Sequence, residues 1–384
     1  MQILTALDIA AIVLVGIHFG VPLTYYWYLK RKWLLKPWNI KLDPNYKPKI
    51  TVIIPTYNEV KLIEKKMDNI YGQEYPKDKL EVIIIDSAST DGTLEKVRQW
   101  IEQHANPTNF KLIQEPERKG KAHALNTALK YVTGKVVIIT DVDSWWPGDN
   151  TLMETIKWLA DPKIGAVSCL KRPANPGKTR IEESYRQYYN ILRIAESKVW
   201  STPIFHGELA AFKADLLNKL GGFPTDIGAD DSYVATRIAL MGLRAIIPET
   251  IWCIEDVPKG IDYHSWRIRR AQHLIQHFLK IIKLLKNSPN KKLRTVLTVE
   301  IYLHLVNPWL LLIGLIILIM ETLSGFIFSL TVLIIGLLAL ALKSFRTWVI
   351  TQMYLIISMV KNIYTKELIW KKQSKESNIM TIKK

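Results

Sequence analysis

Two carboxylates, Asp141 and Asp143, follow an apolar run in the segment VVIITDVDSWWPG, residues 136–148. The β-branched run is typical of a buried strand, and residues i and i+2 of a strand point to the same side. Both carboxylates can therefore face one ligand, and two hard oxygen ligands suit Mg²⁺ or Mn²⁺, which keep positions open for diphosphate oxygens. A motif this short also occurs by chance, and the alternative is a solvated turn at the end of a strand.

The segments around this pair alternate between strand-like and helix-like patterns. The runs at 50–58 and 80–89 are β-branched and end in turn residues, whereas 61–72 and 93–104 have helical spacing. This alternation, which continues through residues 110–143, predicts an α/β fold with a mostly parallel sheet flanked by helices. Ligands of such sheets bind at the carboxyl ends of the strands, where the carboxylate pair is expected. Neither of the two common phosphate-loop motifs of this architecture occurs.

Six segments extend the pattern: VIIPTYNE (52–59), IIIDSASTDGT (83–93), KGKAHALNTAL (119–129), ITDVDSWWPG (139–148), HGELAAFKADLLNKLGGF (206–223) and GADDSYVATRIALMGLRA (228–245). Their order and spacing resemble family 2 glycosyltransferases over about residues 48–250. The resemblance is specific, because six segments must coincide. It implies a GT-A nucleotide-sugar transferase domain, a GDP- or UDP-sugar donor, a divalent cation (Mn²⁺ or Mg²⁺) and inversion of the anomeric centre.

The resemblance assigns donor-binding roles to residues of these segments. Asp86 would lie at the edge of the base, Asp141 near the ribose, and Asp143 would be the chief metal ligand. Lys121 follows a glycine and opens a helix, where the backbone dipole and the ammonium both favour a diphosphate. The alternative for this residue is an ordinary surface lysine. The implied nucleotide-sugar-binding residues are Pro55, Thr56, Asn58, Glu59, Asp86, Lys121 and Asp141.

Asp230 and Asp231 match the Glu-Asp pair of the family. Inverting transfer to a hydroxyl needs a carboxylate that removes the acceptor proton as the bond forms, and the motif position gives this role to Asp231. The metal and Lys121 can neutralise the charge that develops on the departing diphosphate. Asp230 has the simpler alternative of stabilising a helix N-terminus. Because a phosphate acceptor is already anionic, a base at Asp231 favours a sugar hydroxyl as the acceptor.

Other residues are candidates for the acceptor side. Trp145 and Trp146 could pack against a sugar, although tryptophan at a strand end is as often part of the core. His264, where the chain returns towards the membrane segments, is a candidate third metal ligand or an ordinary interfacial histidine. The residues expected in the acceptor or sugar pocket are Trp145, His206, Asp230, Arg269 and Arg270.

One stretch departs from the polymer-making members of the family, such as cellulose and hyaluronan synthases. These members carry a Gln/Arg-x-x-Arg-Trp signature whose tryptophan stacks on the acceptor sugar. The matching stretch here is HSWRIRRAQH, 264–273, with Arg270 at the tryptophan position and Trp266 one turn earlier. An arginine offers no comparable apolar ring face, so processive synthesis is not expected unless Trp266 substitutes.

Apolar segments at both ends predict membrane helices. Residues 1–29 contain no Lys or Arg, and Lys30-Arg31-Lys32 follow directly, as in an uncleaved anchor with its N-terminus outside. The tract 296–342 fits two helices with a turn near 321–325. Residues 347–360 are short for a crossing and favour an interfacial helix over a fourth span. The basic amphipathic pattern at 263–295 predicts another interfacial helix, or alternatively one packed on the soluble domain.

The expected division of the chain is a transmembrane helix at 1–29, a cytoplasmic linker at 30–47, a GT-A catalytic domain at 48–262, an amphipathic interfacial helix at 263–295, a transmembrane hairpin at 296–342, and an interfacial helix with a basic cytoplasmic tail at 343–384. Much of the net charge of +17 lies beside the membrane segments, where anionic lipid is a simpler partner than nucleic acid. Cys169 and Cys253 have no metal-type spacing and are expected to be buried apolar residues.

The sequence therefore predicts an inverting, metal-dependent, multi-pass glycosyltransferase of the cell membrane whose catalytic domain faces the cytoplasm. It would move one hexose to a hydroxyl of a lipid-linked glycan. By analogy with short membrane-anchored members of the family, the expected hexose is mannose and the expected donor is GDP-mannose. The alternatives are a polyprenyl-phosphate hexosyltransferase, a processive polysaccharide synthase and a catalytically silent nucleotide-sugar-binding scaffold.

Overall fold

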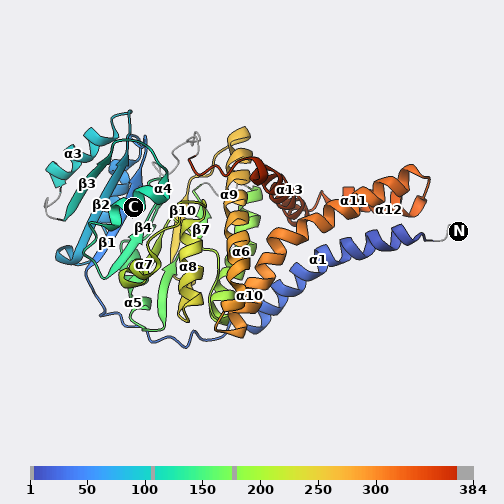
Figure 1. Ribbon diagram of the computed structural model, residues 1–384, viewed down its shortest axis with the longest axis horizontal. Helices are drawn as coiled ribbons and strands as arrows, with labels where there is room; N and C mark the ends of the chain where they lie inside the picture. Colours follow the sequence, from blue (N-terminus) through green and yellow to red (C-terminus); the bar gives the residue numbers. More distant parts are fainter. Residues whose placement is uncertain (1–3, 105–108, 175–179, 370–384) are drawn as a thin grey trace.

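The computed structural model describes residues 4–104, 109–174 and 180–369. Figure 1 shows an α/β domain from which long helices extend towards the N-terminus of the chain. The main sheet has seven strands in the order β3-β2-β1-β4-β8-β6-β9. Its strands are β1 (Ile50–Thr56), β2 (Leu80–Ser87), β3 (Phe110–Glu115), β4 (Val136–Ile139), β6 (Ile164–Ser168), β8 (Ala210–Lys213) and β9 (Arg244–Ile246). All neighbouring strands are parallel except at β8, which is antiparallel to β4 and β6.

A second, three-stranded sheet lies beside the first. It consists of β5 (Ser144–Trp145), β10 (Trp252–Glu255) and β7 (Leu170–Pro173), with β10 in the centre. The helices of the domain are α2 (Ile63–Tyr71), α3 (Thr93–His104), α4 (Lys121–Leu129), α5 (Thr151–Leu159), α6 (Arg180–Val199), α7 (Ala214–Leu220) and α8 (Asp230–Leu240), with a 3₁₀ turn at Lys77–Lys79. The mixed, mostly parallel sheet flanked by helices is the predicted architecture.

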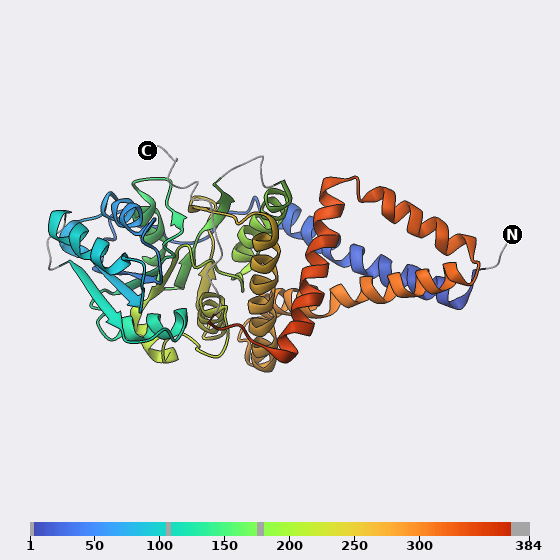
Figure 2. The ribbon, with the colours of Figure 1, turned by 90° about the horizontal axis from the view of Figure 1, so that it is seen from above.

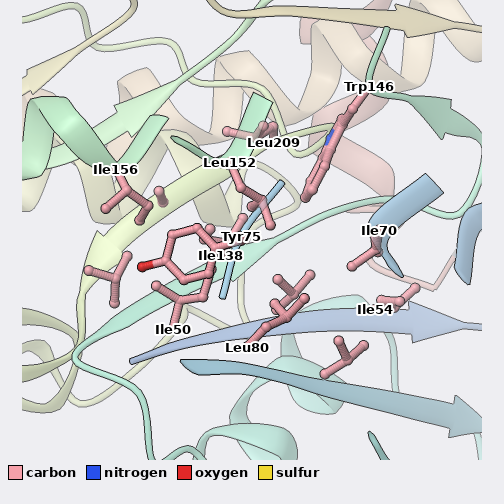
Figure 3. Packing of buried hydrophobic residues seen from close by; sticks show 14 of the residues in the cluster. Ile50, Ile54, Ile70, Tyr75, Leu80, Ile138, Trp146, Leu152, Ile156 and Leu209 are labelled. Atoms are coloured by element: carbon pink, nitrogen blue, oxygen red, sulfur yellow. The ribbon is translucent and has the colours of Figure 1, made fainter. Parts of the chain in front are cut away.

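The strands of the main sheet bury both faces, because their side chains alternate between two apolar clusters. On β1, Val52 and Ile54 contribute to one cluster, whereas Ile53 contributes to the other. The first cluster includes Trp146, as Figure 3 shows. A strand buried on both sides cannot slip in register without moving apolar groups, so the sheet holds the ends of β1 and β4 in place.

The remaining helices are α1 (Ala6–Lys32), α9 (Gly260–Ile281), α10 (Lys291–Ile301), α11 (Asn307–Leu323), α12 (Ile327–Ala339) and α13 (Lys343–Tyr364), with a 3₁₀ turn η2 (Ile282–Asn287) and a π-helical turn η3 (Tyr302–Val306). In the described chain, two helices are long and apolar enough to cross a membrane, Ala6–Lys32 and the continuous Lys291–Leu323. A third crossing is added if α12 and α13, bent by 107°, form one span. Figure 2 shows α12 diverging from α11 and α13 crossing back beside the domain.

Two of the helical segments differ from the simplest expectation. The second arm of the expected hairpin, α12, has 13 residues, fewer than the roughly 20 that a crossing requires. The amphipathic α9 packs against the domain and against α13, as in the alternative for this segment, and its polar residues have buried partners. Gln276 donates to Asn362 Oδ1 at 3.0 Å, and Ser358 donates to the carbonyl of Ile268 at 2.7 Å.

Cys169 and Cys253 are buried and form no disulfide.

Candidate active site

A cavity of about 680 Å³ lies at the carboxyl ends of β1 and β4 and continues between α6 and α9. Most of the predicted donor-binding residues line it: Pro55, Thr56, Asn58, Glu59, Lys121 and Asp141. The reason is the strand order, because β1 and β4 are parallel neighbours and the loops that follow them meet at one edge of the sheet.

The loop after β1 is fastened to the loop after β2. Asn58 adopts a left-handed backbone conformation, with φ of 55°, and its amide donates to Ser89 Oγ at 2.8 Å. In return, the Asn58 side chain accepts from the amide of Thr90 at 2.8 Å. Asp86 is buried and accepts from Thr56 Oγ1 at 3.1 Å and from the Ser89 amide at 2.9 Å. Asp86 is not among the residues that line the cavity, although Ser87 is, and the hydrogen bonds of Asp86 hold the two loops together.

Asp143, the predicted chief metal ligand, and Asp141, predicted near the ribose, both line the cavity. Their turn rests on a buried lysine, because Lys66 Nζ donates to the carbonyl and the hydroxyl of Ser144 at 3.0 and 3.1 Å. Burial lowers the pKa of Lys66 to about 8, and the charges of Asp141 and Asp143 oppose this shift. Within the described residues, no group of three His, Cys, Asp or Glu side chains could hold a metal ion. The two carboxylates are hard oxygen donors that fit a cation whose other ligands come from a diphosphate or water.

Lys121 lies at the first turn of α4, directly after Gly120, which has a φ of 102°. Its Nζ lies 2.5 Å from Asp141 Oδ1. Burial disfavours the ammonium, but Asp141, Asp230 and Asp231 together raise the pKa of Lys121 above its usual value. The Lys121 side chain therefore stays protonated, and it lies at the N-terminus of α4, where the helix dipole favours a bound anion such as a diphosphate.

Asp230 and Asp231 begin α8, and both line the cavity. Asp231 Oδ1 accepts from the amide of Ser232 at 2.6 Å. Asp230 is buried, and its Oδ2 has no hydrogen-bond partner in the described structure. Burial raises the pKa of Asp230 to about 7, with Lys121 opposing the shift and Asp231 and Asp141 adding to it. Two adjacent carboxylates thus occupy different environments, a common arrangement at sites of proton transfer.

His206, Arg269 and Arg270, which were expected on the acceptor side, also line the cavity, as does Trp266. Arg270 pairs with Glu255 and lies 4.6 Å from the centre of the Trp266 ring. Trp266 lies in the cavity wall one turn before the position of the polymerase tryptophan, and its side chain is almost fully buried, with 1% exposed. Burial, together with the nearby Lys171 and Arg186, lowers the pKa of His206 well below its usual value, so its imidazole is neutral.

Besides Asp86, two predicted site residues, His264 and Trp145, lie outside the cavity lining, and their environments explain why. His264 Nδ1 lies 2.7 Å from the hydroxyl of Tyr354 on α13, where it links two helices. Trp145 belongs to β5 and packs against Ile254, with Lys65 Nζ 5.3 Å from its ring centre. Its neighbour Trp146 is part of the core, so both tryptophans take the structural alternative. None of the contacts that His264 and Trp145 make with the described residues supports a metal-binding or sugar-binding role.

The structure also brings residues to the site that the sequence analysis did not single out. Gly207 is one, because a Cβ atom placed there would lie 2.6 Å from Lys121 Nζ, 3.4 Å from Asp141 Oδ2 and 3.6 Å from Asp231 Oδ2. Its only sequence signal is its position in the HGELAAF segment. Others are on α6, where Tyr185, Arg186 and Tyr189 line the cavity. That helix lies in no matched motif, so nothing in the sequence distinguished them.

Comparisons with known proteins agree with this fold and site. A family model described as "Glycosyl transferase family 2" matches residues 51–221. The structure of a mannosyltransferase from Pyrobaculum calidifontis, solved in complex with GDP-Man and Mn²⁺, superposes on this chain with a TM-score of 0.86. The two sequences are 53% identical, and the match covers 94% of this chain and 100% of that one. The chain belongs to glycosyltransferase family 2 and has the GT-A fold, which confirms the predicted family and fold class.

More distant relatives include poly-beta-1,6-N-acetyl-D-glucosamine synthases of two staphylococci. The Staphylococcus epidermidis protein is 25% identical over 285 residues, 72% of this chain and 68% of its own length. The Staphylococcus aureus protein is 26% identical over 269 residues, 67% of this chain and 64% of its own length.

Proposed function

We propose that this glycosyltransferase moves one mannose, with inversion, from GDP-mannose to a sugar hydroxyl of a lipid-linked glycan. The observation that carries the proposal is the cavity in which Lys121, Asp143 and Asp231 converge at the ends of β1 and β4. The choice of GDP-mannose rests on the Pyrobaculum structure, whose 53% identity extends over its whole length.

The donor diphosphate would lie between Lys121 and the carboxylates of Asp141 and Asp143. These two carboxylates would hold a divalent cation, which, when bound, neutralises the negative charge of the diphosphate leaving group. Lys121 would act on the same charge, because its ammonium already lies in the carboxylate cluster at the N-terminus of α4. When the diphosphate arrives, Lys121 would exchange part of its contact with Asp141 for phosphate oxygens.

Asp231 would be the general base. It receives the proton of the acceptor hydroxyl as the oxygen attacks the anomeric carbon and the bond to the diphosphate breaks. The Ser232 amide on Asp231 Oδ1 orients this carboxylate towards the cavity. Burial raises the pKa of Asp230 to about 7, and we assign this carboxyl a structural or electrostatic role at the start of α8.

The far end of the cavity supports a lipid-linked acceptor. There the lining includes His304 of η3, within the apolar helix Lys291–Leu323, and Thr351 and Leu355 of α13. A glycan on a membrane lipid could reach the base from this side. Lys30, Arg31 and Lys32 at the domain end of α1 favour a cytoplasmic catalytic domain under the positive-inside rule.

Processive synthesis remains a second candidate because of Trp266. Its ring lines the cavity one turn from the polymerase position, and two relatives are named as polysaccharide synthases. The products distinguish the candidates, since a single mannose added per acceptor supports the first and a ladder of products supports the second.

The test is nucleotide release by the detergent-purified chain, with a panel of GDP- and UDP-sugars, Mn²⁺ or EDTA, and a lipid-linked oligosaccharide extract. We expect release from GDP-mannose alone, dependent on metal and acceptor and lost in Asp143→Ala. The matched control is Asp149→Ala, because Asp149 is exposed and directly follows the segment that contains Asp143. Binding of donors without release from any of them would instead favour the silent scaffold.

A further inference from the structure

A group of buried charges, which we call the α6–α9 charge cluster, lies between α6 and α9 beside the second sheet. Its cations are Lys171, Arg186, Arg267 and Arg270, and its carboxylates are Glu182, Glu208 and Glu255. Lys171 Nζ lies 2.9 Å from Glu208 Oε1, and Arg186 Nη2 lies 2.5 Å from Glu255 Oε2. These ion pairs connect helices and strands that are far apart in the sequence.

The charges in this cluster do not balance. Its members among the described residues are four cations and three carboxylates, and all four cations line the cavity. Arg269, which adjoins Arg270, also lines the cavity, but it lies within reach of the charges of Asp143 and Asp141 and is not counted in this cluster. Because a buried charge is costly unless it is paired, the surplus of one cation within this cluster favours an anionic group beside it, at a distance from the carboxylates at the end of β4 and the start of α8.

Arg267 has the weakest pairing of the cluster. Its ion pair with Glu182, from Nη1 to Oε2, measures 3.5 Å. That carboxylate already accepts from Arg186 Nε at 2.5 Å and from the Tyr263 hydroxyl at 3.2 Å. Arg267 is 7% exposed, yet its Nε has no hydrogen-bond partner in the described structure. Its guanidinium lies 3.8 Å from the centre of the Tyr185 ring, which fixes the plane of the fork.

The position of Arg267 suits the phosphorylated end of a lipid-linked acceptor. His273 of α9 packs against Gly228, just before Asp230, because a Cβ atom at Gly228 would lie 2.2 Å from its ring. Arg267 lies six residues earlier on α9, which corresponds to about 9 Å along a helix axis. It also lies 5.9 Å from the ring centre of Tyr354 on α13, towards the apolar helices.

We propose that Arg267 binds the phosphoryl group that joins the acceptor glycan to its lipid carrier. The inference rests on the proposed function, in which the acceptor is lipid-linked and its hydroxyl meets Asp231. The glycan would then occupy the space between Asp231 and Arg267, beside Trp266 and Tyr185. The guanidinium fork matches the geometry of phosphate oxygens, and the partnerless Nε gains an acceptor.

The test uses the full chain in a non-ionic detergent with GDP-mannose, Mn²⁺ and two acceptors that carry the same glycan. One acceptor has a short polyprenyl diphosphate, and the other has an uncharged alkyl chain of equal length. The variants are Arg267→Gln, Arg267→Lys and the control Lys280→Gln. Lys280 lies on the same helix but pairs with Asp226 at 2.6 Å outside the cavity lining.

We expect Arg267→Gln to raise the KM of the diphosphate acceptor about ten- to hundredfold, as for the loss of hydrogen bonds to a charged group. The KM values of the uncharged acceptor and of GDP-mannose should stay unchanged. Arg267→Lys keeps the positive charge but loses the planar guanidinium. It should raise the KM of the diphosphate acceptor by a smaller factor and leave the KM of the uncharged acceptor unchanged. It serves as the decisive variant if Arg267→Gln does not fold, and Lys280→Gln should match the wild type.

Equal KM increases for both acceptors in Arg267→Lys or Arg267→Gln would overturn the inference, because Arg267 would then act only through the fold. Stimulation of transfer to the uncharged acceptor by added phosphatidylglycerol, absent in the variants, would also overturn it and assign the site to a lipid headgroup. A wild-type protein that transfers mannose to neither acceptor would instead contradict the proposed function itself.

Discussion

Lys121 Nζ lies 2.5 Å from Asp141 Oδ1, which joins the N-terminus of α4 to the end of β4. The pair places an ammonium and a carboxylate on one wall of the cavity, within the same cluster as Asp231. Under the proposed function, the site would bind both a divalent cation and a diphosphate, which requires both signs of charge at close range. Before the donor binds, the contact would therefore hold Lys121 and Asp141 in the positions from which they would bind the diphosphate and the metal ion.

Replacing Lys121 should remove much of the stabilisation of the leaving diphosphate. We expect Lys121→Gln to lower kcat/KM for the donor by about a hundredfold or more, as for the loss of one preorganised donor at a charged transition state. The matched control is Lys119→Gln, because the Lys119 side chain is 49% exposed and pairs with Glu117 outside this cluster. Steady-state nucleotide release measures both, and equal activities of the two variants would contradict the role of Lys121.

Replacing Asp231 should test the general base. We expect Asp231→Asn to lower kcat by about 10²- to 10⁴-fold with little change in donor affinity, because the amide cannot accept the hydroxyl proton. Asp215→Asn is the control, since the Asp215 side chain is 63% exposed on α7. Single-turnover transfer and donor binding by calorimetry separate the two effects. Full activity of Asp231→Asn would point to a phosphate acceptor, which needs no base.

The raised pKa of Asp230 predicts a pH-dependent contribution to stability. The folded protein takes up this proton near pH 7, whereas the unfolded chain does so near 3.8, so acidification from pH 8 to 5 favours the folded state. Asp230→Asn cannot gain this proton. We therefore expect the stability of the wild type relative to Asp230→Asn to rise by roughly 1 to 3 kcal/mol over this range.

Thermal melting of both proteins at several pH values provides the measurement. Asp215→Asn again serves as the control, and its difference from the wild type should stay flat between pH 5 and 8. A flat difference for Asp230→Asn as well would show that the carboxyl does not titrate near 7.

A methyl group at Gly207 should displace Lys121 without disturbing the fold. The added Cβ would lie 2.6 Å from Lys121 Nζ, the end of a flexible side chain, so the ammonium would move away from Asp141. We expect Gly207→Ala to melt like the wild type but to lose about tenfold or more in kcat/KM for the donor. Gly20→Ala, where a Cβ atom meets nothing within 4 Å, is the control. A fully active Gly207→Ala would show that the contact is not needed.

Much of the donor side of the site was predictable because it depends on local patterns. The carboxylates Asp141 and Asp143 follow one β-branched run, and the turn residues that begin at Pro55 follow a second one at 50–54. The carboxylates and the turn residues were therefore both expected at strand ends. The acceptor side was less predictable. Arg270 was expected there from the motif, but the wall opposite, on α6, comes from a helix with no motif at all.

By itself, the sequence determined the chemistry of this protein, namely which side chains end the strands, which helix opens with Lys121 and which segments are apolar. These properties depend on residue types and short spacings. Only the tertiary structure decided which distant groups meet. It paired His264 with Tyr354 and Arg267 with Tyr185, and it seated α9 on α13 instead of leaving it as an isolated interfacial helix. Such contacts depend on how buried polar groups find partners across the whole fold, and no local pattern specifies that choice.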